Sequence, residues 1–427
     1  MTSRERTLAA LRHEEPDRVP IDFGGHRSSG IAAIAYARLR EALGITSGEI
    51  RVYDMIQQLA IIEPEVLDAL GVDTVELGRG FMHDPAAWQE WVLPDGTPCL
   101  IPSYLNVERR GGDWFLLDDD GTDLAVQPHG ALYFDQVHWP WLEEEPDQQD
   151  FADLEEALAG NMWGAAVTPG ADIPLTPDGC RQLAGGARRL RESTDRAIVG
   201  IFGGNLFEVP QFLYRNDNYL MHLGQFPEDC ERLSEALTGF YLSRLEAWLG
   251  AVGPSIDVVL FGDDFGGQNG PLISPAMYRR CFKPWQAKLW GRAKELAPHV
   301  KVNLHSCGGL EPLLDDLIDA GLDTLNPVQI TCDGMDPRHL KDTYGERLTF
   351  WGGGCDTRHT LPHARPDEIR AHVGDLLSIW SPGGGYIFQQ VHNIQADVPP
   401  ENILAMFEAV RRHRPAGKPV PANPCQA

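Results

Sequence analysis

A histidine and a cysteine stand two residues apart where a strand-like run meets a helical one. Val300, Val302 and Leu304 alternate with polar residues that end in His305, which is the period of a β-strand with one polar face. In an extended chain, residues two apart point the same way, so the imidazole of His305 and the thiol of Cys307 converge. Imidazole nitrogen and thiolate sulfur are donors that Zn²⁺ prefers. The spacing predicts a metal site; the alternative is a hydrogen-bonded histidine beside a packed thiol.

Three carboxyl side chains follow other strand-like runs. Asp263 and Asp264 end the run 256–261, and Glu208 follows the run 197–202 after a Gly-Gly-Asn turn. Carboxylates at strand ends can orient a substrate, act as acid or base, or support a ligating histidine. We predict catalytic roles for all three, first for Asp264. The alternative is a carboxylate that binds backbone N–H groups at a turn or helix start.

His392 and Asn393 lie past the last strand-like run of the chain. Polar loop residues at such a position often contact ligands. We therefore place both among the residues that bind the cofactor or the substrate.

The elements that must position these residues alternate between strands and helices. Short apolar runs, turns and amphipathic helical patterns follow one another from about residue 195, which indicates a parallel sheet. Helical patterns near 3–11, 31–43 and 54–70 accompany two earlier strands. The predicted strands are 18–23, 72–77, 197–202, 256–261, 300–305, 322–327, 347–351 and 385–391. Eight strands predict a (β/α)₈ TIM barrel, whose catalytic groups lie at the carboxyl ends of the strands.

The pattern changes between Trp88 and Trp141, where short alternating runs are broken by Pro-Asp-Gly, Gly-Gly and Asp-Asp-Gly turns. Such turns are typical of antiparallel hairpins. We predict a single barrel domain over residues 1–414 with an inserted β cap at 88–141. Residues 415–427, rich in proline and small residues, are predicted to be a flexible tail.

Composition excludes several function classes. The chain has 36 Lys and Arg against 62 Asp and Glu, a net charge of −26, which argues against a nucleic-acid partner. No apolar run reaches the ~18 residues of a membrane-spanning helix, so no membrane association is expected. Eight irregularly spaced cysteines and a polar N-terminus favour a cytoplasmic protein without a disulfide framework.

Four segments together resemble a known family. They are residues 10–20 (ALRHEEPDRVP), Gly262-Asp263-Asp264 with Ile273-Ser274-Pro275, the turn at 305–308, and Pro399-Pro400-Glu401-Asn402. Over nearly its whole length the chain resembles the uroporphyrinogen decarboxylase superfamily, within it the corrinoid-linked, zinc-dependent methyltransferases. The decarboxylases carry an arginine-rich segment at their first strand that grips tetrapyrrole carboxylates. The counterpart here is 21–27 (IDFGGHR), so the resemblance favours the methyltransferase branch.

The resemblance also implies a third zinc ligand. Methyltransferases of this branch take it from a cysteine in a Pro-Gly-Cys-Gly segment, whose counterpart here, 381–385 (SPGGG), has no thiol. Cys355, after the strand 347–351 and three glycines, is our first choice as replacement. His392 is the second choice.

The implied activity is zinc-dependent transfer of a methyl group between a small molecule and the cobalt of a corrinoid. The chain lacks the Asp-x-His-x-x-Gly motif of cobalamin-binding domains, so we expect the corrinoid on a separate partner protein. The small molecule is either a methyl ether such as a methoxyarene, which makes the reaction an O-demethylation, or a thiol acceptor. The direction of transfer stays open.

Two rival interpretations remain. One is a metal-free decarboxylase or lyase that uses Asp263 and Asp264 on a small carboxylated substrate. The other, a non-catalytic binding module, is disfavoured because several reactive side-chain types gather at strand ends. The oligomeric state is open, and a homodimer is compatible with the sequence.

Overall fold

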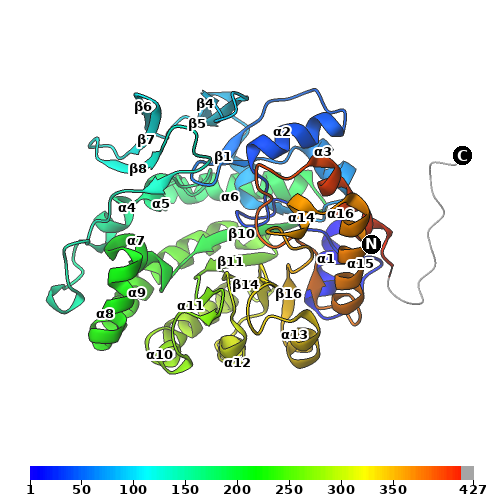
Figure 1. Ribbon diagram of the computed structural model, residues 1–427. Helices are drawn as coiled ribbons and strands as arrows, with labels where there is room; N and C mark the ends of the chain where they lie inside the picture. The colour runs from blue at the N-terminus through cyan, green and yellow to red at the C-terminus, as the bar shows by residue number, and fades with distance from the viewer. Residues whose placement is uncertain (415–427) are drawn as a thin grey trace, which may run out of the picture.

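A parallel sheet of seven strands forms the centre of the protein, whose computed structural model describes residues 1–414 (Figure 1). The predicted tail at 415–427 lies outside the described residues. In chain order the strands are β3 (Thr74–Glu76), β10 (Ala197–Gly203), β11 (Val258–Gly262), β14 (Lys301–His305), β15 (Thr324–Asn326), β16 (Thr349–Trp351) and β17 (Tyr386–Ile387). Each strand pairs in parallel with the next one along the chain.

The predicted first strand closes this sheet into a barrel. Ile21 forms a parallel bridge with Phe388, and the N–H of Asp22 donates to the carbonyl of Phe388 at 2.8 Å. On the other side the N–H of Asp73, just before β3, donates to the carbonyl of Ile21 at 2.7 Å. The first strand is therefore shorter than the predicted 18–23, but it bonds to both edges of the sheet. The predicted (β/α)₈ TIM-barrel fold is confirmed.

Helices surround the barrel and cover the outer faces of its strands (Figure 1). They are α1 (Ser3–Leu11), α2 (Ala33–Ala42), α3 (Pro64–Leu70), α6 (Pro177–Ser193), α7 (Glu208–Tyr214), α8 (Asn216–Gln225), α9 (Pro227–Val252), α10 (Pro275–Cys281), α11 (Lys283–Leu296), α12 (Leu314–Asp319), α13 (Pro337–Tyr344), α14 (Thr360–His363), α15 (Pro366–Trp380) and α16 (Pro400–Arg412). Seven of the fourteen have proline as their first residue, where the missing N–H costs no helix bond.

The helix after the His/Cys turn shows why the sequence folds this way. Leu313, Leu314 and Leu317 are fully buried against the sheet, as their spacing of three to four residues predicts. The helix itself is shorter than that pattern, because a 3₁₀ turn, η5 (Glu311–Leu313), precedes α12.

The structure corrects one predicted helix. Residues 54–70 form a short hairpin, β1 (Val52–Asp54) with β2 (Leu59–Ala60), and only Pro64–Leu70 is helical. The carboxylate of Asp54 accepts the N–H of Gln57 at 2.9 Å, and Gln58 has a positive φ of 53°. Both features belong to a tight turn and interrupt the helical backbone that the apolar pattern predicted.

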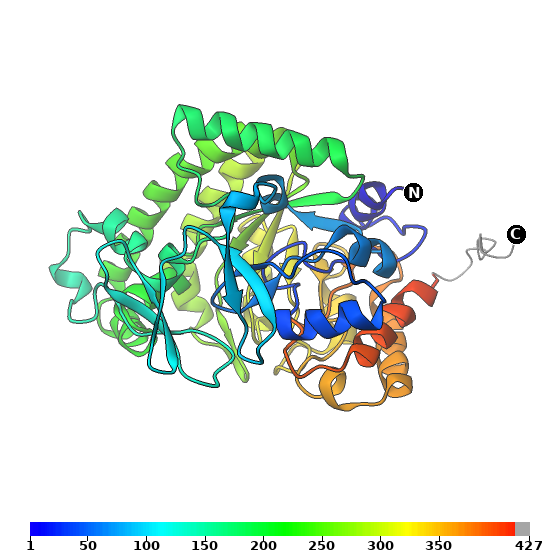
Figure 2. The same ribbon diagram turned by 90° about the horizontal axis from the view of Figure 1, so that it is seen from above.

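Two antiparallel sheets occupy the inserted segment. One pairs β4 (Trp88–Val92) with β5 (Pro98–Pro102), and the other has the order β6-β7-β8-β9. Its strands are β6 (Val107–Arg110), β7 (Asp113–Leu117), β8 (Asp123–Gln127) and β9 (Asp135–Gln136), followed by α4 (Leu154–Ala159) and α5 (Met162–Ala165). The insert lies along one side of the molecule, away from the N-terminus, in both views (Figures 1 and 2). Among the described residues, no helix is long and apolar enough to cross a membrane.

Candidate metal centre

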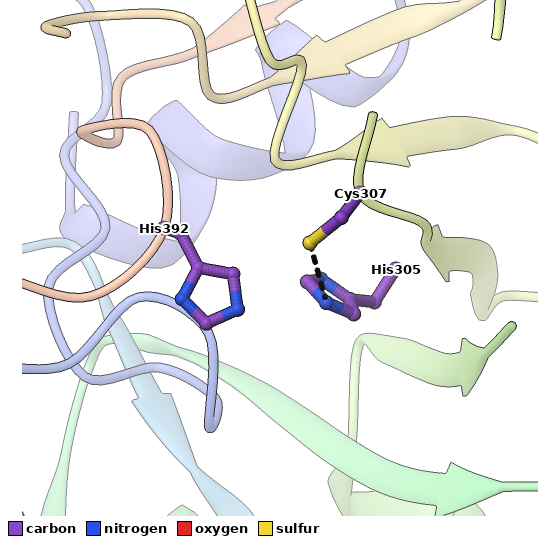
Figure 3. Close-up of side chains that lie close together, drawn as sticks. All are labelled: His305, Cys307 and His392. Atoms are coloured by element: carbon purple, nitrogen blue, oxygen red, sulfur yellow. Dashed lines mark hydrogen bonds between the residues drawn. The ribbon is translucent and has the colours of Figure 1, made fainter. Parts of the chain in front are cut away.

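Three side chains that can bind a metal converge at the carboxyl end of the barrel. His305 ends β14, Cys307 follows it by two residues, and His392 comes from the loop after β17. One ligand atom of each lies within 4.8 Å of those of the other two. Figure 3 shows the His392 ring directed from its own loop toward the other two side chains. His305 and Cys307 thus lie side by side, as their spacing predicts, and His392, the second choice for a third ligand, lies beside them.

The distances within this group suit a zinc ion. Nε2 of His305 lies 3.6 Å from Sγ of Cys307. A tetrahedral zinc about 2.3 Å from sulfur and about 2.0 Å from nitrogen would separate those atoms by about 3.5 Å. The ligand atoms of His305, Cys307 and His392 all lie within 4.8 Å of one another. Side-chain movements of about 1 Å would therefore bring all three to bonding distance from one zinc ion.

The protonation states also suit a cation. Burial lowers the pKa of His305, and burial together with the nearby His305 and His26 lowers the pKa of His392 to about 3. Both rings are therefore neutral at pH 7; Nδ1 of His392 accepts the N–H of Asn393 at 2.9 Å, so His392 would have to give up that hydrogen bond to offer the lone pair of Nε2. Burial raises the pKa of the Cys307 thiol well above its usual value, and the charges of Asp264 and Glu208 raise it further. A bound cation would reverse this effect and favour the thiolate.

Tight backbone contacts fix the turn that carries Cys307. Gly308 has a φ of 87°, and a Cβ built on it would lie 2.2 Å from the backbone of Gly266. Only glycine fits such a close approach with a positive φ. The N–H of Gly308 also donates to Oε1 of Gln329 at 3.0 Å. The Gly-Gly after Cys307 thus allows the thiol to stay beside His305.

Asp264 lies next to this group, as predicted. Its Oδ1 accepts the N–H of Cys307 at 2.8 Å and lies 3.6 Å from Nε2 of His305. About a third of its side chain, 34%, is exposed, so the carboxylate can also reach a ligand in the barrel mouth. Asp264 is therefore placed to hold both Cys307 and His305 in position.

Glu208 faces the same region from the start of α7. Burial raises the pKa of Glu208 well above its usual value, and the charges of Asp264 and Asp263 add to the effect. Its Oε2 accepts a hydrogen bond from Nδ2 of Asn205 at 2.7 Å. Glu208 can therefore hold a proton at neutral pH, which is the property that a general acid requires.

Asp263 requires a correction. Its side chain is fully buried, and its two oxygens accept the N–H groups of Leu206, Phe207 and Glu208 at 2.8–3.0 Å. Nε2 of Gln286 donates a fourth hydrogen bond at 3.1 Å. These four donors occupy the carboxylate and tie the end of β11 to the start of α7. We therefore withdraw Asp263 from the predicted catalytic set.

Cys355 also requires a correction. It is fully buried, and within residues 1–414 its Sγ has one hydrogen-bond partner, the carbonyl of the next residue, Asp356, at 3.9 Å. The sequence placed Cys355 at the barrel rim correctly, but its side chain points into the packed protein. Burial raises the pKa of the Cys355 thiol far above its usual range. His392, and not Cys355, belongs to the group of side chains that lie within reach of one ion.

The side chain of Asn393 is committed to neighbouring loops. Its Oδ1 accepts the N–H of Gly30 at 2.7 Å, and its Nδ2 donates to Gln57 at 3.0 Å. Its backbone N–H donates to Nδ1 of His392 at 2.9 Å. Asn393 thus holds the loop of His392, where the sequence predicted a direct contact with the cofactor or substrate.

Sequence reasoning missed Asn326, whose Oδ1 lies 2.8 Å from Nδ1 of His305. A usable signal was present, since Asn326 is the last residue but one of the predicted strand 322–327 and His305 ends the preceding predicted strand. In the parallel register these two residues are direct partners.

The chain is similar to known proteins both in sequence and in fold. The family model described as uroporphyrinogen decarboxylase (URO-D) matches residues 174–413, which include every residue of the candidate site. A uroporphyrinogen decarboxylase of Methylococcus capsulatus is 31% identical over 337 residues, 74% of this chain and 91% of the relative. That of Legionella pneumophila is 27% identical over 345 residues, 76% and 92% of the two chains. A methyltransferase structure from Methanosarcina mazei superposes with a TM-score of 0.56 at 17% identity, covering 96% of this chain and 98% of that one.

Proposed function

This chain belongs to the uroporphyrinogen decarboxylase family, and on that premise we propose that it is a zinc-dependent methyltransferase acting with a separate corrinoid protein. The single observation that carries the proposal is the group of His305, Cys307 and His392 at the barrel mouth. Decarboxylation as such needs no soft metal ligands, whereas methyl transfer to or from a thiol or an ether oxygen benefits from them. The likeness in fold to a methyltransferase is consistent with this choice.

His305, Cys307 and His392 would hold the zinc ion and leave a fourth position for the substrate. When bound, zinc would supply a Lewis acid that polarises an ether oxygen or lowers the pKa of a thiol. The substrate is a methyl ether such as a methoxyarene, or a thiol acceptor. The corrinoid protein delivers cobalt to the open end of the barrel.

The chain's own carboxyl groups would then have distinct tasks. In demethylation of an ether, the methyl carbon forms its bond to Co(I) while the bond from carbon to oxygen breaks, so the leaving oxygen needs a proton. Glu208 is a half-buried acid with a raised pKa, and the hydrogen bond from Asn205 engages only its Oε2, so we assign it this proton. Asp264 would keep the Cys307 turn and the His305 ring in place through its Oδ1.

The proposal is tested by metal content and methyl transfer measured on the same preparations. We expect about one zinc per chain in the wild type and loss of zinc in H305A, C307S and H392A. With cob(I)alamin as probe, a panel of methoxyarenes should produce the absorbance of methylcobalamin; with methylcobalamin, a panel of thiols should discharge it. Wild-type protein that binds no zinc and transfers no methyl group in either direction would overturn the proposal.

A second candidate is a metal-free decarboxylase or lyase for a small carboxylated substrate, favoured by the names of the relatives from Legionella and Methylococcus. It requires release of CO₂ that is unchanged in H305A and C307S. Zinc-dependent methyl transfer and zinc-independent release of CO₂ therefore separate the two functions.

A further inference from the structure

One buried amide fixes how the ring of His305 is presented. Asn326 lies opposite His305 in the register of β14 and β15, and its Oδ1 is 2.8 Å from Nδ1 of the ring. The Asn326 side chain is fully buried. Water therefore cannot take over this contact, and the orientation of one side chain depends on the other.

The amide of Asn326 is itself held in one orientation. Its Nδ2 donates to the backbone carbonyl of Trp351 at 2.9 Å and to Oε1 of Gln389 at 2.5 Å. If the amide were turned over, its oxygen would face these two acceptors, and both buried hydrogen bonds would be lost. The oxygen must therefore face His305.

Two further residues complete this arrangement at the seam of the barrel, where the first strand meets the chain after β17. Nε2 of Gln389, after β17, donates to the carbonyl of Ser28 at 2.8 Å, and Ser28 follows the first strand. The hydroxyl of Ser28 donates to Oδ1 of Asn326 at 3.2 Å. Ser28, Asn326 and Gln389 thus form a closed set of hydrogen bonds that we call the seam network.

Because Oδ1 of Asn326 can only accept a hydrogen bond, the neutral imidazole of His305 can adopt only one of its two tautomers here. Nδ1 of His305 must carry the proton, and Nε2 must carry the lone pair. Nε2 is the atom that lies 3.6 Å from Cys307 Sγ. We propose that Asn326, held by the seam network, is a positioning residue that fixes His305 as the Nδ1–H tautomer and so directs its free lone pair toward Cys307 and His392. Only the use of that lone pair for metal binding rests on the function proposed above.

The tautomer can be read directly by ¹⁵N NMR of the histidine ring in the metal-free full-length protein. In the wild type we expect a protonated Nδ1 and an unprotonated Nε2 at His305. In N326A the acceptor is gone, and the proton should move to Nε2, toward Asp264 Oδ1 at 3.6 Å. N326D keeps an acceptor opposite Nδ1 and should preserve the wild-type tautomer, although its second oxygen loses the hydrogen bonds that the amide nitrogen donates to Trp351 and Gln389.

N303A provides the matched control. Asn303 is also a fully buried amide of the barrel, two residues before His305, and its side chain has no hydrogen-bond partner among residues 1–414. Its removal should leave the His305 tautomer unchanged. Near-ultraviolet circular dichroism verifies that each variant is folded before its spectrum is interpreted.

Titration with Co²⁺ as probe then tests the consequence. Affinity should fall about 10- to 100-fold in N326A and stay near the wild-type value in N303A. A wild-type His305 protonated on Nε2, an unchanged tautomer in N326A, or equal Co²⁺ affinity of N326A and wild type would overturn the inference. The expected tautomers in a protein that binds no Co²⁺ would support the positioning role and contradict the metal centre, so the two failures are distinguishable.

Discussion

Asp263 and Asp264 are adjacent in the chain but have different partners. Asp263 is fully buried and accepts four hydrogen bonds, three of them from the backbone at the start of α7. Asp264 is 34% exposed and accepts the N–H of Cys307. One carboxylate therefore stabilises the fold and the other borders the candidate site.

This difference predicts that the same substitution costs much more stability at Asp263 than at Asp264. In D263N, an amide group that donates must face N–H groups that also donate, and we expect a loss of about 2–4 kcal/mol in the free energy of unfolding. In D264N the amide oxygen can still accept the N–H of Cys307, so the loss should stay below about 1 kcal/mol. Urea denaturation at pH 7.5 measures both. Equal losses in the two variants would contradict the structural assignment of Asp263.

Cys355 and Cys307 provide a second comparison. Cys355 is fully buried and does not belong to the group of possible metal ligands, whereas Cys307 lies 3.6 Å from His305 Nε2. We expect C355S to keep the zinc content of the wild type while losing about 1–2 kcal/mol of stability, because a hydroxyl replaces a packed thiol. C307S should lose zinc. Metal analysis of the two purified variants decides which thiol is the ligand, and zinc loss in C355S would restore the prediction made from the sequence.

The barrel and the pair of His305 and Cys307 could be predicted because they depend on local patterns. Alternation placed both side chains on one face of a strand, and the strand count indicated the barrel. His392 instead depends on how the loop after β17 folds back, with a positive φ of 63° at His392 itself. Asp263 and Asp264 could not be separated from the sequence either, because burial and the helix start that Asp263 binds arise only in the tertiary structure.

Glu76 gives a prediction of pH dependence. It ends β3, is 5% exposed and lines a cavity of about 260 Å³ with Phe202 and Tyr241, and its carboxyl group has no hydrogen bond or ion pair among residues 1–414. Burial raises its pKa from 4.5 to about 7, although the charges of Arg27 and Arg79 oppose this. The folded protein therefore binds a proton at Glu76 more tightly than the unfolded chain does between these two pH values.

Ionisation of Glu76 makes the folded protein less stable as the pH rises. Below pH 4.5 the carboxyl group is protonated in both states and costs nothing; as pH rises toward 7 the unfolded state ionises first, and stability falls. The difference amounts to about 3 kcal/mol at pH 8. E76Q should therefore be more stable than the wild type at pH 8 by up to about 3 kcal/mol, with a much smaller gain at pH 5. Denaturant unfolding at the two pH values tests this, and a gain that does not depend on pH would show that ionisation of Glu76 is not the cause.

Gly308 gives a prediction about the backbone turn that holds Cys307. A Cβ at this position would lie 2.2 Å from the backbone of Gly266, and the φ of 87° adds a cost of about 1–2 kcal/mol for any side chain. Gly44 provides the matched control, because its φ is 71° but nothing lies within 4 Å of a Cβ built there. G44A should lose only the backbone cost, whereas G308A must also move the turn after Cys307. We expect G308A to lose zinc as well as stability, and G44A to keep its zinc. Zinc bound to G308A with wild-type affinity would mean that the turn does not set the position of the thiol.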